Sequence, residues 1–142
     1  MKKLTFILPL KLSKRIWLLS IPSLLFSTNL MASEYYCEAS SKWDGDDLLY
    51  SQDHLDKYKF AVKIKEVGDE AILSRCSFQS SAGKVTCDDY LADYIYSDPV
   101  VGHKKYYYFR GQFDVQIFSN LFFVENNGRG SIAMGNCKLT RP

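Results

Sequence analysis

Apolar and polar residues alternate one by one over long stretches of this chain. From Lys57 to Val67 the alternate positions are mostly apolar on one side and mostly lysine on the other. The apolar positions are Tyr58, Phe60, Val62 and Ile64, and the lysines are Lys57, Lys59, Lys63 and Lys65. A period of two places successive side chains on opposite faces of a strand. The pattern therefore predicts a strand over 57–67 with one buried face.

The longest alternation runs from Lys104 to Phe118. One face carries Tyr107, Phe109, Phe113, Val115 and Ile117. The other face carries a tyrosine-rich row, which consists of Tyr106, Tyr108, Arg110, Gln112, Asp114 and Gln116. A single strand of this length would extend to about 50 Å at about 3.3 Å per residue, which is too long for a small domain. We therefore expect a bulge or bend at Gly111.

The remaining segments give weaker patterns. A turn at Gly68-Asp69 leads into a strand over 70–78, whose Ile72, Cys76 and Phe78 share one face. Residues 84–96 favour a strand because of their tyrosines, although a short helix after the two aspartates is the alternative. Residues 40–57 have no clear period, and they are expected to form a loop or a short helix.

Two apolar runs, 121–124 and 132–134, flank the tract Asn126-Asn127-Gly128-Arg129-Gly130. This arrangement predicts a hairpin rather than a phosphate-binding loop, which would need a following helix. A two-residue turn at Asn127-Gly128 would pair Phe123 with Ile132, whereas a three-residue loop would pair Val124 with Ile132.

The strands together predict an all-β fold, a small antiparallel β-barrel or β-sandwich of about six to eight strands with meander connections.

The first 33 residues have the composition of a targeting segment. They contain five basic residues and no acidic residue, followed by the apolar run Ile16–Phe26. That run is shorter than the about 20 apolar residues that a membrane-spanning helix needs. We predict a Sec-type signal peptide over 1–33, cleaved after Ala32 or Ser33, with an uncleaved anchor or an internal start as the alternative. Residues 34–142 then form a single all-β domain that is periplasmic or extracellular, without a stable membrane span.

All four cysteines lie in that domain, and an even number in an exported chain predicts two disulfides. Three pairings are possible. A turn centred on Ser81-Ala82 would place Cys76 opposite Cys87, with Phe78 opposite Val85, which favours Cys76–Cys87 and leaves Cys37–Cys137 to join the first strand to the last. A zinc site is disfavoured because the chain has no Cys-x-x-Cys motif and no histidine at ligand spacing.

The positive charge of the chain belongs to its first segment. Residues 34–142 carry thirteen basic and sixteen acidic residues, so their composition gives no support for nucleic-acid binding. The acidic tract Asp44-Gly45-Asp46-Asp47 lacks the full ligand set of a calcium loop and is read as a turn. We expect no metal and no cofactor.

Catalysis is not expected either. Only two histidines, His54 and His103, are available as bases, and oxidised cysteines offer no thiolate. A carboxylate pair like that of a glycosidase is the remaining enzymatic alternative.

Candidate binding residues lie mainly on the tyrosine-rich row. Tyrosine and arginine are enriched at binding hot spots, so Tyr106, Tyr108, Arg110, Gln112 and Asp114 are the predicted contacts, together with Arg129 in the hairpin turn. The alternative is a ladder of cross-strand pairs that only stabilises the sheet. The lysine row over 57–65 is read mainly as protection of a sheet edge, with contact to an acidic partner as the alternative.

The tract Tyr35-Tyr36-Cys37, the strand count and the terminal Cys137 resemble the β-barrel inhibitors of lysozyme in architecture. The Ser-Gly-x-x-Tyr type of loop associated with inhibition in that family has no counterpart here, so the resemblance implies a fold and not an activity.

The leading hypothesis is an exported, non-enzymatic binding or inhibitory module whose partner is a protein or a glycan of the cell envelope. The alternatives are a structural or stress-related envelope protein and, less favoured, a carboxylate-based hydrolase. A protruding rigid loop would favour an inhibitor, an exposed aromatic face would favour a binder, and converging acids would favour an enzyme.

Overall fold

The computed structural model describes residues 32–45 and 48–141, so nearly all of the expected signal peptide lies outside the described residues. The described residues form ten strands and one short helix. These are β1 (Glu34–Asp44), β2 (Leu48–Leu49), α1 (Gln52–Tyr58), β3 (Ala61–Val67), β4 (Glu70–Gln79), β5 (Lys84–Leu91), β6 (Tyr94–Ser97), β7 (Lys104–Tyr108), β8 (Phe113–Ile117), β9 (Phe122–Asn126) and β10 (Ile132–Arg141). The predicted all-β antiparallel fold is confirmed. The helix in these residues is too short to cross a membrane.

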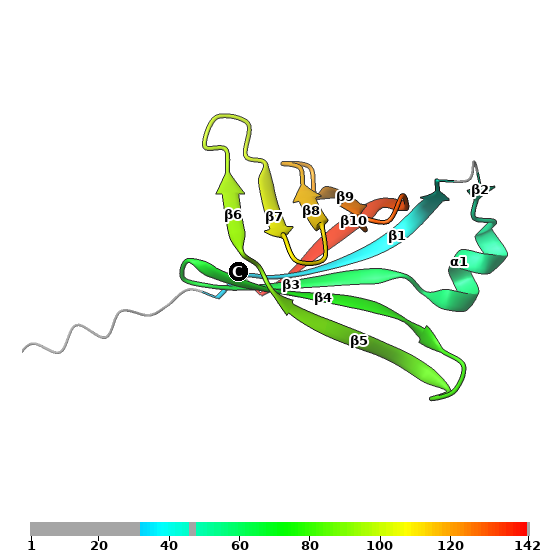
Figure 1. Cartoon of the computed structure of the whole chain (residues 1–142). Helices are drawn as coiled ribbons and strands as arrows, with labels where there is room; N and C mark the ends of the chain where they lie inside the picture. Colours follow the sequence, from blue (N-terminus) through cyan, green and yellow to red (C-terminus); the bar gives the residue numbers. More distant parts are fainter. Residues whose placement is uncertain (1–31, 46–47, 142) are drawn as a thin grey trace, which may run out of the picture.

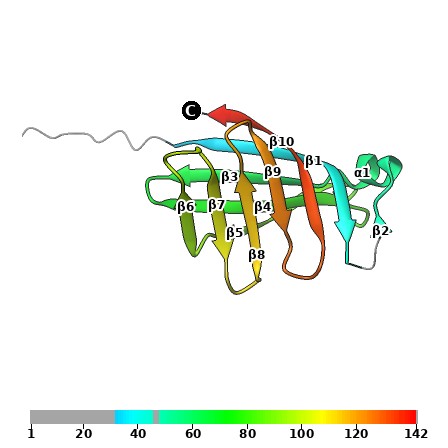
Figure 2. The ribbon, with the colours of Figure 1, turned by 90° about the horizontal axis from the view of Figure 1, so that it is seen from above.

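One antiparallel sheet contains all ten strands, in the order β5-β4-β3-β1-β10-β9-β8-β7-β6, with the short β2 paired to β1. The sheet bends over itself, so that β3–β5 form one arm and β6–β9 the other, and their strands cross (Figures 1 and 2). The sheet is not closed, because β5 and β6 remain as its two edges. The expectation of a barrel or sandwich with six to eight strands is corrected accordingly.

The hydrophobic core lies between the two arms. Its largest fully buried side chains include Tyr106 from β7, Phe123 from β9, and Ile64 and Leu73 from β3 and β4. On β4 the core face carries Ala71 and Leu73. The predicted face with Ile72, Cys76 and Phe78 therefore points away from this core, because side chains alternate along the strand, and on that face Ile72 is exposed whereas Cys76 is buried.

Both predicted disulfides are confirmed. Cys37 and Cys137 face each other across β1 and β10, where the two ends of the domain meet, and both lie in the core. Cys76 and Cys87 face each other across the β4–β5 hairpin. The same hairpin pairs Phe78 with Val85, so the predicted register is confirmed.

The predicted strand over 57–67 begins too early. Lys57 and Tyr58 end helix α1, and Lys59 adopts a left-handed conformation that stops the helix. Ser51 caps the helix by accepting a hydrogen bond from the His54 N–H, and the buried Leu55 anchors it. The lysine row is thus divided between helix and strand. Helix α1 has only two turns, which is too short to show a helical period in the sequence. The alternation of its last residues with those of β3 is therefore a coincidence.

The long stretch over 104–118 is a hairpin and not a bent strand. β7 ends at Tyr108, the chain turns through 109–112, and β8 returns along β7 with Tyr106 opposite Val115. Gln112 takes a positive φ of 53° in this turn. Gly111 therefore lies in a turn, and the predicted bulge is wrong. The turn also exchanges the two faces, so that residues of odd number are outside on β7 and inside on β8.

The β9–β10 hairpin is confirmed, but neither predicted register is correct. Ile132 pairs with Asn126 and Met134 pairs with Val124, which leaves a five-residue loop over 127–131. The Asn127 side chain accepts hydrogen bonds from the N–H groups of Arg129 and Ser131, at 2.8 and 3.0 Å. An asparagine side chain that bonds to the backbone of its own loop stabilises this wider turn. Residues 84–96 form strands β5 and β6, as favoured from the sequence.

Candidate functional site

The structure does not keep the tyrosine-rich row on one surface. Tyr106 is completely buried, and Tyr108 is half-buried against the core. Arg110 and Gln112 lie in the β7–β8 turn, where the Gln112 carbonyl packs directly against Gly128 of the neighbouring loop. Asp114 lies on the outer face of β8.

Lys105 forms an ion pair with Asp114 at 3.1 Å, and Arg129 is exposed in the β9–β10 loop. The structure therefore brings the turn of Arg110 and the loop of Arg129 close together and separates both from Tyr106. Binding by the exposed members of the set remains a prediction.

A different set of aromatic side chains is exposed. Tyr94, Tyr96 and Phe109 are 53%, 46% and 63% exposed, and Tyr107 lies between Tyr94 and Phe109 with ring centroids 5.9 and 6.0 Å away. We call these four residues the outer aromatic cluster. The sequence pattern grouped Tyr107 and Phe109 with the core residues of β8. Recognising the turn at 109–112 would have separated them.

The loop between β6 and β7 projects from the molecule at the end of these strands (Figure 1). Its tip carries Val100 and Val101, which are 90% and 48% exposed. The Asp98 carboxylate accepts hydrogen bonds from the N–H groups of both valines, at 2.8 and 3.1 Å. These backbone hydrogen bonds lower the pKa of Asp98. The loop is thus an ordered apolar projection beside the outer aromatic cluster.

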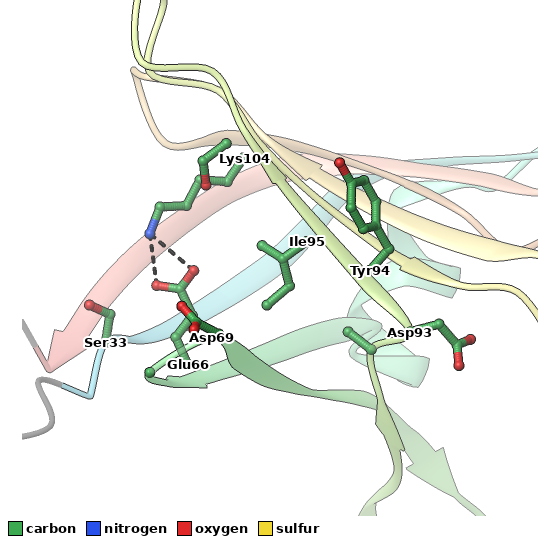
Figure 3. Close-up of a pocket in the computed structure, with 10 residues that line it drawn as sticks. Ser33, Glu66, Asp69, Asp93, Tyr94, Ile95 and Lys104 are labelled. Atoms are coloured by element: carbon green, nitrogen blue, oxygen red, sulfur yellow. Dashed lines mark hydrogen bonds and ion pairs between the residues drawn. The ribbon is translucent and has the colours of Figure 1, made fainter.

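A polar groove of about 570 Å³ lies between the edge strand β6 and the β3–β4 turn (Figure 3). Glu66 near the end of β3 and Asp69 in the turn line one wall, and Ile95 and Lys104 project toward them from β6 and β7 (Figure 3). Asp93 lies at the other end. The groove exists because the sheet does not close at this point.

A hydrogen-bond network joins the groove to the core. The two Glu66 oxygens lie 2.7 and 3.0 Å from the Lys104 ammonium, and Glu66 Oε1 also accepts a hydrogen bond from the Tyr106 hydroxyl at 2.8 Å. Lys104 donates to the Tyr35 hydroxyl as well. Burial lowers the pKa of Lys104, but the hydrogen bonds to Glu66 and Tyr35 outweigh this effect and raise it overall. Burial, with the charge of Glu66, raises the pKa of Tyr106 far above its usual range.

Two acids of this groove, Glu66 and Asp93, serve as hydrogen-bond acceptors within the protein. Glu66 is bonded on both oxygens by Lys104 and Tyr106, and Asp93 accepts from the Phe109 N–H at 2.7 Å. A glycosidase needs one carboxyl group that stays protonated to donate its proton. Both oxygens of Glu66 are instead occupied by contacts within the protein, so neither is free to reach a substrate. The arrangement therefore favours a structural role for Glu66.

We predict that Tyr106→Phe lowers the free energy of unfolding by about 2 kcal/mol near neutral pH, because a buried hydrogen bond to a charged group is lost. The native pKa of Tyr106 is raised, so its contribution is complete below the unfolded-state pKa of about 10 and is lost as the pH rises above it. The difference between the wild type and Tyr106→Phe should therefore shrink from pH 10 upward. Urea unfolding of both proteins between pH 7 and pH 11 measures this.

Tyr94→Phe is the control, because it removes a phenol hydroxyl from an exposed tyrosine. Its free energy of unfolding is expected to stay within about 0.5 kcal/mol of the wild type at pH 7. A Tyr106→Phe difference that stays constant or grows above pH 10 would contradict the assignment.

A second charged cluster lies toward the other end of the inner face. Arg75 Nε contacts Glu125 at 2.5 Å, and Lys42 places its ammonium 4.1 Å from the centre of the Phe60 ring. Burial lowers the pKa of Lys42, while the charge of Glu125 acts in the opposite direction. These residues line a small cavity of about 180 Å³ together with Tyr90 and Asp88. Cations and carboxylates balance in this cavity, so it has no net charge to select a ligand.

Within the described ranges no group of three or more His, Cys, Asp and Glu side chains is arranged to hold a metal ion. Comparison with protein families, with curated proteins and with solved structures finds no match for this chain.

Proposed function

We propose that this chain is an exported, non-enzymatic binding module that holds a protein or glycan of the cell envelope at the outer aromatic cluster. The observation that carries the proposal is the exposure of Tyr94 and Tyr96 on β6 together with Phe109, which follows β7 and lies beside Tyr107. Rigid aromatic rings offer a large contact area at a low cost in conformational entropy, which makes them frequent binding anchors.

Two features support the proposal. Both cysteine pairs are joined as disulfides, which persist in oxidising, exported compartments. The ordered apolar loop with Val100 and Val101 extends the aromatic surface and would enter a depression on a partner, as expected of an inhibitory module.

The test compares the wild type with a double variant, Tyr96→Ser and Phe109→Ser. Each oxidised protein, purified from cells that express the whole chain, is immobilised and exposed to periplasmic and extracellular extracts. We expect one or a few components to be retained by the wild type and to fall at least about tenfold with the variant, since two anchors of a hot spot are removed.

Leu139→Ser is the matched control, because Leu139 on β10 is as exposed as Tyr96, at 46%. A component that is lost equally from this control is retained by general hydrophobicity. The proposal is wrong if the double variant retains the same components as the wild type while its urea midpoint is unchanged.

A further inference from the structure

The edge of β6 offers backbone groups to another strand. In an antiparallel pair, alternate residues direct their N–H and C=O groups to the partner strand. Asp98 donates its N–H to the His103 carbonyl across the same hairpin. Counting back by twos along β6, the backbone N–H and C=O groups of Tyr96 and Tyr94 are then the ones directed toward β7. Ile95 and Ser97 then direct their backbone groups to the open edge. No strand within residues 32–45 and 48–141 pairs with that edge.

The two edges of the sheet differ in sequence. β5 carries Lys84, Asp88 and Asp89, and charged side chains of this kind protect an edge from pairing with other chains. β6 reads Tyr-Ile-Tyr-Ser, without a charge, proline or glycine. Aromatic and β-branched residues favour strand pairing. β6 is therefore the edge suited to receive a partner strand.

The polar groove lies directly against this edge. Ile95 and Ser97 line it from β6, and Gly68 and Asp69 line it from the β3–β4 turn (Figure 3). Its volume of about 570 Å³ leaves room for a short extended segment, because paired strands lie about 4.8 Å apart.

The charge of the groove selects the incoming segment. Four charged side chains line it, and Lys104 is neutralised by its contact with Glu66. Asp69, in the exposed turn, remains as a carboxylate without a cation partner, whereas the Asp93 carboxylate accepts a hydrogen bond from the Phe109 N–H and points away from Glu66 and Lys104 (Figure 3). The groove is acidic and complements lysine or arginine side chains.

We propose that this groove binds an extended, basic segment of a partner polypeptide, which pairs with β6 as an added strand. The inference rests on the proposed function, because it identifies the partner as a polypeptide and adds a second contact beside the outer aromatic cluster. Strand addition uses main-chain hydrogen bonds for affinity and side-chain pockets for specificity. Here Asp69 supplies the specificity for positive charge.

The experiment measures fluorescence anisotropy of a tagged, end-blocked six-residue peptide of alternating valine and lysine. Two comparison peptides carry glutamate in place of lysine, or N-methyl groups on the backbone of alternate residues. We expect the basic peptide to bind the oxidised wild type at least about tenfold more tightly than either comparison peptide does. Charge repulsion should weaken the glutamate peptide, and the loss of main-chain hydrogen bonds should weaken the N-methylated peptide.

Variants of the protein locate the site. Ser97→Pro removes an N–H that faces the open edge and should weaken the basic peptide at least about tenfold. Asp69→Lys, in an exposed turn, should weaken it by a similar factor, whereas Asp89→Lys makes the same charge change on β5 and should leave binding within about twofold. If Ser97→Pro fails to fold, Asp69→Lys still tests whether the peptide binds in the groove.

The inference is overturned if the wild type does not bind the basic peptide, if the N-methylated peptide binds equally well, or if Asp69→Lys has no larger effect than Asp89→Lys. It is also overturned if sedimentation shows a dimer that Ser97→Pro dissociates, because a second copy then occupies the edge. If the wild type retains an envelope component through Phe109 but does not bind the basic peptide, the proposed function stands and this inference alone is wrong.

Discussion

Replacing Cys37 and Cys137 together with alanine is expected to lower the free energy of unfolding by about 4–5 kcal/mol. The two cysteines are 100 residues apart, so their bond restricts nearly the whole domain in the unfolded state. A domain of this size typically has only 5–15 kcal/mol of stability. The variant should therefore unfold partly or completely at physiological temperature.

The second disulfide is the matched control for this prediction. Cys76 and Cys87 are 11 residues apart, and their removal is expected to cost about 3 kcal/mol on the same entropic argument. Urea unfolding of both double variants, followed by circular dichroism without reductant, measures the two losses. A larger loss for the Cys76–Cys87 pair would contradict the ranking.

Gly135→Ala is expected to cost at least about 3 kcal/mol, because the extra methyl group has no space. A Cβ at Gly135 would overlap the Glu38 carbonyl oxygen and lie 2.9 Å from the Ser40 N. Both obstacles are backbone atoms of β1, at the bulge between Ala39 and Ser41. A flexible side chain would move away, but this strand is held between β10 and β3.

Thermal unfolding of Gly135→Ala measures this loss. Asn136→Ala is the control, because Asn136 is the next residue on β10 and is exposed, so its change should stay within about 0.5 kcal/mol. If both variants melt within a degree of the wild type, the close approach of β1 and β10 does not require glycine at position 135, and the prediction is wrong.

Gly135 illustrates what the sequence did not reveal about the fold. It lies between Met134 and Asn136 in a segment read simply as a strand. Only the pairing of β1 with β10 shows that these strands approach too closely for a side chain. A bulge of this kind bends a strand, and here it helps β1 to pass from one arm of the sheet to the other.

The candidate site shows the same limit. The alternation over 104–118 correctly located strand residues and aromatic side chains, and it assigned the buried face of β8 correctly, but it assigned the wrong faces on β7. Tyr106 was expected on a binding surface, and it is a core residue bonded to Glu66. Tyr107 and Phe109 were grouped with the core residues of β8, and they belong to the outer aromatic cluster.

The sequence by itself determined the properties that depend on local pattern and on composition. Alternation and turn residues predicted an antiparallel all-β domain, and the hairpin around Ser81-Ala82 placed Cys76 opposite Cys87. The remaining two cysteines were then assigned by elimination.

Only the tertiary structure decided which faces are buried, where the sheet ends, and what lies at its edge. Burial on a strand depends on the element that packs against it, and turns of different length exchange the two faces without changing the composition. The open edge of β6, and the acidic groove beside it, arise because strands distant in the sequence bend toward each other without pairing. No local pattern contains that information.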